Sequence, residues 1–132
     1  MGERLLQAWG RGYNGAGELG LRAAAAALKR CRFYLGNDSG AMHLAASTGI
    51  PCVAIFSSRE SPGSWYPYGE GHTVFRTPIA CEGCMLVECV DRSMECLASI
   101  RAADVLEACR ETMRRAPKPS TGPRSSRPLF DP

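Results

Sequence analysis

Apolar residues at helical spacing alternate along this chain with short, continuous apolar runs. Residues 21–30 (LRAAAAALKR) are strong helix formers, with Leu21 and Leu28 on one face. Residues 101–115 repeat that periodicity, with Val105 and Cys109 on the apolar face. The pattern predicts an amphipathic helix over each stretch.

Between these helices, three short stretches have the pattern of strands. Residues 32–36 (RFYLG) and 52–56 (CVAIF) are apolar runs of strand length, and residues 73–77 (TVFRT) alternate. A turn after the first run leads to a predicted helix over 41–48, which Gly49 and Pro51 end. Strand, tight turn, helix and strand form a βαβ unit with parallel strands. We therefore predict an α/β fold, a Rossmann-like parallel sheet with flanking helices.

Length and charge divide the chain into three parts. Its 132 residues, 45% hydrophobic and 22% charged, fit one globular domain. The net charge is +3, but the basic excess lies in residues 114–132, so a nucleic-acid-binding face is not indicated. We predict an N-terminal segment and Gly-rich loop over 1–20, the α/β domain over 21–115, and a disordered tail rich in Pro and Arg over 116–132.

The sequence has no feature of a membrane-spanning or secreted protein. Its apolar runs are shorter than the roughly 18 residues that cross a bilayer. The first nine residues lack the apolar core of a signal peptide. We therefore expect a cytoplasmic protein without a transmembrane segment, in a compartment where cysteine clusters more often bind metal or stay reduced than form disulfides.

The turn after the first strand is the best candidate ligand site. Ligands of open α/β sheets bind beyond the carboxyl ends of strands, and the free N–H groups of a helix start suit a phosphate. Ser39 adds a hydroxyl donor, Gly40 allows close approach, and the Asp38 carboxylate can accept hydrogen bonds from sugar hydroxyls. Alternatively, Asp38 or Ser39 simply caps the helix, and His43 is a buried, hydrogen-bonded histidine.

A long loop over 57–71 follows the second strand and should border the same crevice. Its Trp65 and Tyr66 could stack on a base, or they could pack as an ordinary aromatic pair. His72, just beyond the loop, is expected to be a surface residue.

Four of the seven cysteines form the pattern Cys81-x2-Cys84-x4-Cys89-x6-Cys96. Four thiolates so close in sequence could enclose a tetrahedral zinc. Reduced structural thiols and disulfides are the alternatives that the spacing leaves open. Cys31, Cys52 and Cys109 lie in apolar patterns and are expected in the core.

The run YLGNDSGAMHLAASTGIPCVAIF, residues 34–56, resembles the signature of glycosyltransferase family 9, the ADP-heptose:lipopolysaccharide heptosyltransferases. In that family a strand precedes G-N-D-[ST]-G-x-x-H-L-A-A, and a G-x-P-V-V-A-L-F strand follows. The resemblance extends over residues 17–113. It implies part of the C-terminal, donor-binding domain of a GT-B enzyme.

The resemblance also implies a reaction, the inverting transfer of a sugar from an ADP-sugar, expected to be ADP-heptose, to a lipopolysaccharide-type acceptor. No cofactor is required for this transfer, although a structural zinc at the cysteine cluster is one interpretation. The resemblance implies that Asp38 contacts donor hydroxyls, that Ser39 and Gly40 hold the diphosphate, and that His43 lies close by.

Departures from the family pattern are equally informative. The N-terminal acceptor domain, where the catalytic base is expected, and the start of the donor domain have no counterpart here. We expect the chain to be incomplete for catalysis alone, and a separately encoded N-terminal half is one partner that would complete it. A complete enzyme could also bind peripherally at the inner membrane. The alternative is a non-catalytic remnant or a small interaction module built on a zinc ion with four cysteine ligands.

Overall fold

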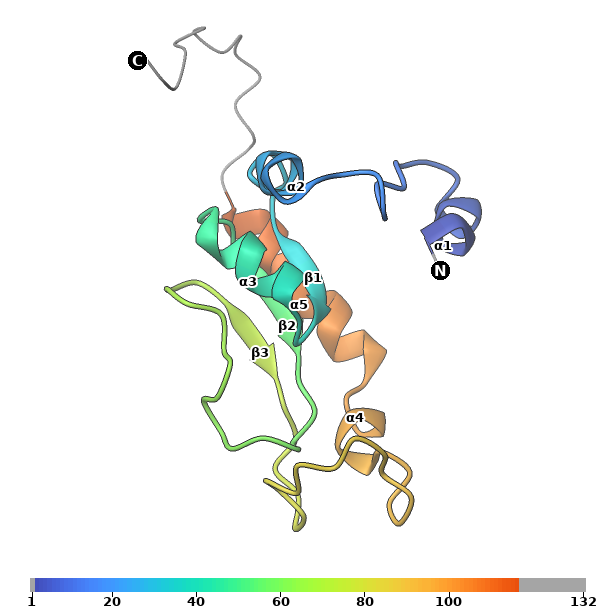
Figure 1. Cartoon of the computed structure of the whole chain (residues 1–132), viewed down its shortest axis with the longest axis vertical. Helices are drawn as coiled ribbons and strands as arrows, with labels where there is room; N and C mark the ends of the chain where they lie inside the picture. Colours follow the sequence, from blue (N-terminus) through green and yellow to red (C-terminus); the bar gives the residue numbers. More distant parts are fainter. Residues whose placement is uncertain (1, 117–132) are drawn as a thin grey trace, which may run out of the picture.

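Three parallel strands form the sheet in a computed structural model that describes residues 2–116 (Figure 1). The strands lie in the order β1 (Tyr34–Asn37), β2 (Cys52–Ile55) and β3 (Thr73–Phe75). Tyr34 pairs with Cys52 and Val53 pairs with Thr73, so all three strands end at the same edge. The α/β fold with a parallel, Rossmann-like sheet is confirmed.

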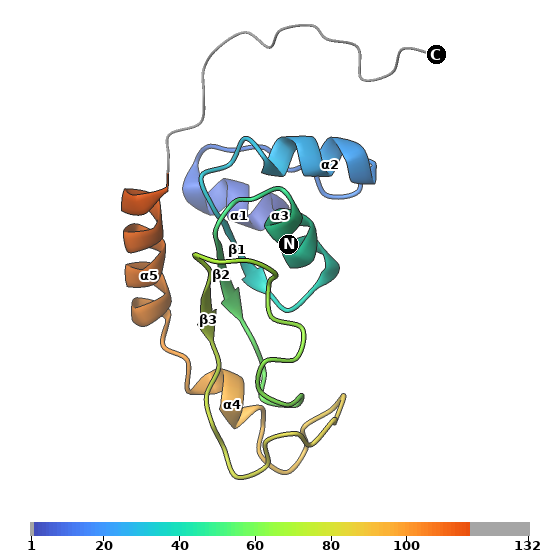
Figure 2. The same cartoon turned by 90° about the vertical axis from the view of Figure 1, so that its left-hand side faces the viewer.

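Helices cover both faces of this sheet. Helices α2 (Leu21–Leu28) and α3 (Gly40–Ser47) lie on one side, and α5 (Ala102–Arg115) lies on the other (Figure 2). The predicted elements are all present, with ends close to those expected. Two further helices, α1 (Gly2–Trp9) and α4 (Glu95–Ala98), lie within the stretches described above as the N-terminal segment and the cysteine cluster.

The central strand explains how one sheet makes two cores. Cys52 and Ala54 of β2 face α3 and pack with Met42, whereas Val53 faces α5 and packs with Val105. The residues of β2 from Cys52 to Ala54 are fully buried because both faces of the strand are covered. This is why β2 is a continuous apolar run rather than an alternating one.

Gly49 and Arg32 stabilise the carboxyl ends of α3 and α5. Gly49 follows α3 with a φ of 81°, the left-handed conformation that ends helices and that glycine adopts without strain. Arg32, just before β1, donates from Nη2 to the carbonyl oxygens of Met113 and, at 2.8 Å, Ala116. A guanidinium at this point is favourable because the carboxyl end of a helix carries partial negative charge.

The expected tail, residues 116–132, lies outside the described residues except for Ala116, which is buried. In the described part of the chain, no helix is long and apolar enough to span a membrane.

Candidate functional site

The connections that follow β1 and β2 lie side by side at the carboxyl edge of the sheet. The N–H of Asp38, the first residue after β1, donates to the carbonyl of Ile55, the last residue of β2, at 3.2 Å. This bond continues the ladder beyond the strand. It brings the Asp38–Gly40 turn next to the start of the 57–71 loop, in the position where α/β sheets bind ligands.

The Asp38–Gly40 turn presents both polar groups and open space. Asp38 is exposed and Ser39 is half-buried. A Cβ built on Gly40 would meet no atom within 4 Å, so the backbone is open to close approach. The N–H groups of Gly40 and Ala41 occupy the first turn of α3, where a helix offers them no internal partner. The turn therefore offers N–H donors at the positive end of a helix and an exposed carboxylate beside them.

Ser39 occupies the N-cap position of α3 but does not cap it with its side chain. Its hydroxyl instead donates to the carbonyl of Asn37 at 3.2 Å. The backbone carbonyl of Ser39 accepts the N–H groups of Met42 and His43, which closes the first turn. The simple capping interpretation is therefore wrong for Ser39, because its hydroxyl donates to a backbone carbonyl and accepts no N–H of the helix.

His43 lies on α3, just after these residues, and is half-buried. Its ring meets the edge of Trp65 from the 57–71 loop, with centroids 6.4 Å apart and planes at 73°. Trp65 is 65% exposed and has a φ of 59°, an uncommon conformation for a bulky residue. Tyr66 instead packs against Phe56 in the core, with centroids 5.1 Å apart. Of these two aromatic residues of the loop, only Trp65 therefore borders the candidate site.

His72 has a structural role that the sequence did not reveal. Its Nδ1 accepts the N–H of Cys52 at 3.0 Å, and its Nε2 lies 3.1 Å from the carbonyl of Tyr68. The half-buried ring thereby links the start of β2 to the loop. His72 is partly exposed, which does not contradict the expected surface position, but its role as the acceptor for the first N–H of β2 was not predicted.

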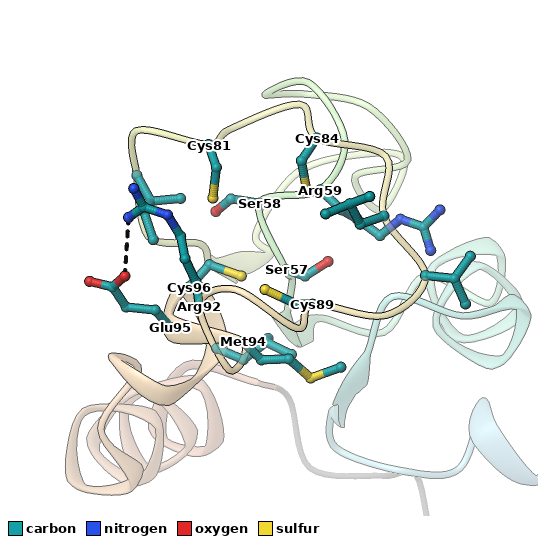
Figure 3. A pocket seen from close by; sticks show the side chains of 14 residues that line it. Ser57, Ser58, Arg59, Cys81, Cys84, Cys89, Arg92, Met94, Glu95 and Cys96 are labelled. Carbon is teal, nitrogen blue, oxygen red and sulfur yellow. Dashed lines mark hydrogen bonds and ion pairs between the residues drawn. The ribbon is translucent and has the colours of Figure 1, made fainter.

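A cavity of about 180 Å³ lies beyond the same sheet edge (Figure 3). Ser57, Ser58 and Arg59 line it from the segment after β2. The segment 79–97 supplies the rest of the lining, which includes all four clustered cysteines, Cys81, Cys84, Cys89 and Cys96. We refer to this cavity as the cysteine pocket. The four cysteines of the sequence motif therefore all line the same cavity.

The cysteine pocket contains free thiols. In the structure of residues 2–116, no three side chains of His, Cys, Asp or Glu form a group that could hold a metal ion as they stand. The four thiols share one cavity but are not drawn together around a single point.

The other three cysteines divide into two kinds. Cys52 and Cys109 are buried in the core, as expected, and burial raises the pKa of the Cys52 thiol to about 11. Cys31 is exposed, and its thiol contacts the carbonyl of Ala27 at 3.6 Å. The core prediction for Cys31 was wrong, because α2 ends at Leu28 and the residue falls in the turn beyond it.

Comparisons with known proteins support the family resemblance found in the sequence. The model of glycosyltransferase family 9 (heptosyltransferase) matches residues 3–94. This match begins before the segment that carries the resemblance and ends before α5. The chain is also similar to lipooligosaccharide heptosyltransferase 2 of Campylobacter jejuni subsp. jejuni serotype O:2, at 26% identity over 86 residues.

That alignment covers 65% of this chain and 27% of the relative, so the chain spans about a quarter of the length of the curated protein it matches. No solved structure matches the chain. The family match includes β1, the Asp38–Gly40 turn, α3, β2 and the cysteine pocket up to Met94. The chain belongs to glycosyltransferase family 9, the heptosyltransferase family.

Proposed function

We propose that the Asp38–Gly40 turn and His43 bind the ADP-sugar donor of a family 9 sugar transfer. The observation that carries this proposal is the open turn itself. Its N–H groups at the start of α3, the Asp38 carboxylate and the unobstructed Gly40 all lie at the carboxyl edge of a parallel sheet.

Each residue has a distinct role in this proposal. The N–H groups of Gly40 and Ala41, with the Ser39 hydroxyl, bind the diphosphate. The Asp38 carboxylate accepts hydrogen bonds from sugar hydroxyls. His43, held against Trp65, adds a ring N–H beside the diphosphate.

The diphosphate is the leaving group when an acceptor hydroxyl attacks the anomeric carbon. The bond from that carbon to the diphosphate oxygen breaks, and negative charge accumulates on the diphosphate. Donors already in position at α3 would stabilise this charge without having to reorganise. We assign no residue of this chain as the general base for the acceptor hydroxyl.

We propose ADP-heptose as the donor and a lipopolysaccharide-type acceptor, on the strength of the family and of a relative named as a lipooligosaccharide heptosyltransferase. In this proposal a second polypeptide, equivalent to the N-terminal half of the enzyme, supplies the acceptor site. The reaction would occur in the cytoplasm, at the inner membrane surface.

Calorimetric titration of the full chain with ADP and with ADP-heptose tests donor binding. We expect ADP-heptose to bind more tightly than ADP, and Asp38→Ala to abolish that preference while affecting ADP little. Asp104→Ala is the matched control, because it removes an exposed carboxylate on α5, which covers the opposite face of the sheet from α3. A folded chain that binds neither ligand would contradict the proposal, as would an equal loss for both ligands in Asp38→Ala.

A further inference from the structure

Helix α1 and the loop that follows it, residues 2–20, form an N-terminal arm in which no residue is buried. Figure 1 shows the arm running out from the start of α2, with α1 set apart from the sheet and from the other helices. Leu5 is 49% exposed and Trp9 is 72% exposed. They are four residues apart, so both side chains lie on the same face of α1. The arm therefore presents an apolar helix face that nothing in the described residues buries.

The arm is held in shape by its own contacts. Gly10 follows α1 with a φ of 70°, and its N–H donates to the carbonyl of Leu6 at 2.8 Å. The side-chain amide of Asn14 donates to the Glu3 carboxylate, which ties the loop back to α1. A helix that is already formed loses little conformational freedom when it docks, and this lowers the cost of binding.

An apolar groove lies between the sheet and α5. Its volume is about 420 Å³, within the range of roughly 300–1,000 Å³ of clefts that bind ligands. All the residues that line it are apolar, among them Leu35 of β1, Ile55 of β2, and Val105 and Leu106 of α5. Leu35 and Leu106 are about half exposed, at 48% and 50%. We refer to this cavity as the β1–α5 groove.

The β1–α5 groove borders an edge strand that has no protection of its own. Strand β1 is last in the strand order, so its outer edge pairs with no other strand of the described residues. Edge strands are commonly protected by charged residues, by proline or by a bulge, or are covered by a helix or loop. Strand β1 reads YLGN, with neither charge nor proline. A helix lying in the groove beside Leu35 would supply the missing cover.

The arm of the same chain is poorly placed to fill this groove. It joins α2, which packs with α3 against one face of the sheet, whereas the groove lies on the face that α5 covers. Each chain nevertheless carries one α1 with an unburied apolar face and one open groove. Two copies that exchange arms satisfy both surfaces at once and form a closed dimer with twofold symmetry.

The charges of the two surfaces do not oppose this exchange. Helix α1 carries one acidic residue, Glu3, and one basic residue, Arg4. Next to the groove residues of α5, the exposed charges form two ion pairs, Arg101 with Asp104 and Arg110 with Glu107. These groups are balanced on both surfaces, so contact between two copies brings no excess of like charge together.

From these observations we propose that the protein forms a dimer in which α1 of each chain lies in the β1–α5 groove of its partner. Leu5 and Trp9 are the anchors, because side chains one turn apart are what an apolar groove recognises on a helix. Tryptophan is also among the residues that most often dominate the energy of an interface. The dimer goes beyond the proposed function, because none of the donor-binding residues belongs to α1 or lines the groove.

Sedimentation equilibrium of the full chain over a wide range of concentration tests the dimer. We expect reversible association, which Trp9→Ala should weaken by about a hundredfold or more, because each dimer contains the contact twice. Leu106→Lys, which places a charge in the groove, should weaken association to a similar extent. Leu21→Ala is the matched control on α2, because Leu21 is as exposed as Trp9, at 73%, and belongs to neither surface. It should leave association unchanged.

A mixture of the two variants separates arm exchange from other modes of association. Trp9→Ala keeps an intact groove and Leu106→Lys keeps an intact α1, so the mixture regains one of the two contacts. It should therefore form heterodimers more readily than either variant forms homodimers. Fluorescence anisotropy of a labelled Trp9→Ala chain, titrated with the unlabelled Leu106→Lys chain, measures this gain. A chain with both substitutions, used as the titrant instead, gives the baseline.

Circular dichroism establishes that each variant is folded, because neither Trp9 nor Leu106 belongs to the two core clusters. Leu35→Thr tests the same groove if Leu106→Lys fails to fold. A folded chain that stays monomeric up to millimolar concentration would overturn the proposal, including one whose α1 packs onto its own groove. So would a dimer that persists in both variants, which is the result that direct pairing of two β1 edges would give.

Discussion

The βαβ unit from β1 to β2 and the segment 81–96 differ sharply in what holds them in place. In the first, Met42, Ala45 and Cys52 are completely inaccessible and pack into one cluster. In the second, every residue is at least partly exposed, and the 81–85 turn is held by backbone hydrogen bonds and by the ion pair of Glu82. The comparison teaches that one of these regions rests on burial, whereas the other depends on links between polar groups.

Truncation of a core methionine should show the largest effect. Met42→Ala removes a fully buried side chain, and we expect a loss of about 2–5 kcal/mol in the free energy of unfolding. Met85→Ala, at a residue 57% exposed in the cysteine segment, should change stability by less than about 0.5 kcal/mol. Urea denaturation followed by circular dichroism measures both. Similar losses of unfolding free energy in the two variants would mean that burial does not distinguish the two regions.

Arg76, which follows β3, joins the segment 81–96 to the 57–71 loop, and its replacement should have an intermediate effect. Its guanidinium pairs with Glu82 and donates to the carbonyl of Glu60 at 2.7 Å. Arg76→Met should cost about 1–3 kcal/mol, because charged hydrogen bonds are lost at a nearly buried site.

Hydrogen exchange locates that effect. Amides of the 81–85 turn should exchange faster in Arg76→Met, whereas those of β2 should change much less. Arg110→Met removes an exposed ion pair to Glu107 on α5 and serves as the control. Unchanged exchange in the turn would mean that Arg76 does not anchor it.

Alkaline pH should weaken the buried region through Cys52. Burial raises the pKa of this thiol from 9.0 to about 11, so the folded chain holds the proton more tightly than the unfolded chain. The corresponding stability is fully present below pH 9 and is lost as the pH rises toward 11. Unfolding measured across this range should show a shallower decline in Cys52→Ala. If the stability of the parent chain and of Cys52→Ala declined equally with pH, the Cys52 thiol would not be the cause of the loss.

The smallest effect is expected for the exposed ion pairs of α5. Arg114 lies 2.6 Å from Glu111 and 3.2 Å from Glu107, and all three side chains are exposed to solvent. Solvent and salt screen such pairs, so Arg114→Ala should leave the unfolding temperature almost unchanged. Thermal unfolding with and without added salt measures this contribution. A loss as large as that of Arg76→Met would show that surface charge matters as much as the links around Glu82.

Local pattern was sufficient to predict the strands and the main helices. The apolar run of β2 indicated a strand by its length and composition, and Gly49 indicated the end of α3, because apolar runs and helix-ending glycines are visible in a sequence. No pattern of residues in the sequence indicated the role of His72. A half-buried acceptor for the N–H of Cys52 is set by the path of the loop, which residue types do not encode.

The candidate sites were predictable to different degrees. The Asp38–Gly40 turn follows directly from strand and helix order, and its place at the sheet edge required no long-range information. The contact between His43 and Trp65 and the meeting of Ser57 with the cysteine loop join residues far apart in sequence. Periodicity carries no information on such contacts. The binding roles of these residues are still predictions.

The position of β2 has a consequence for how this chain tolerates change over evolution. The carbonyl of Ile55 holds the Asp38 turn, and the carbonyls of Ser58 and Arg59 hold the 81–85 turn, so one stretch of backbone sets the alignment of both. Insertion or deletion of one residue in β2 would exchange the side chains of its two faces and displace both turns at once. Lineages can therefore vary the tips of these loops independently, but a length change in this strand would displace both turns in a single step.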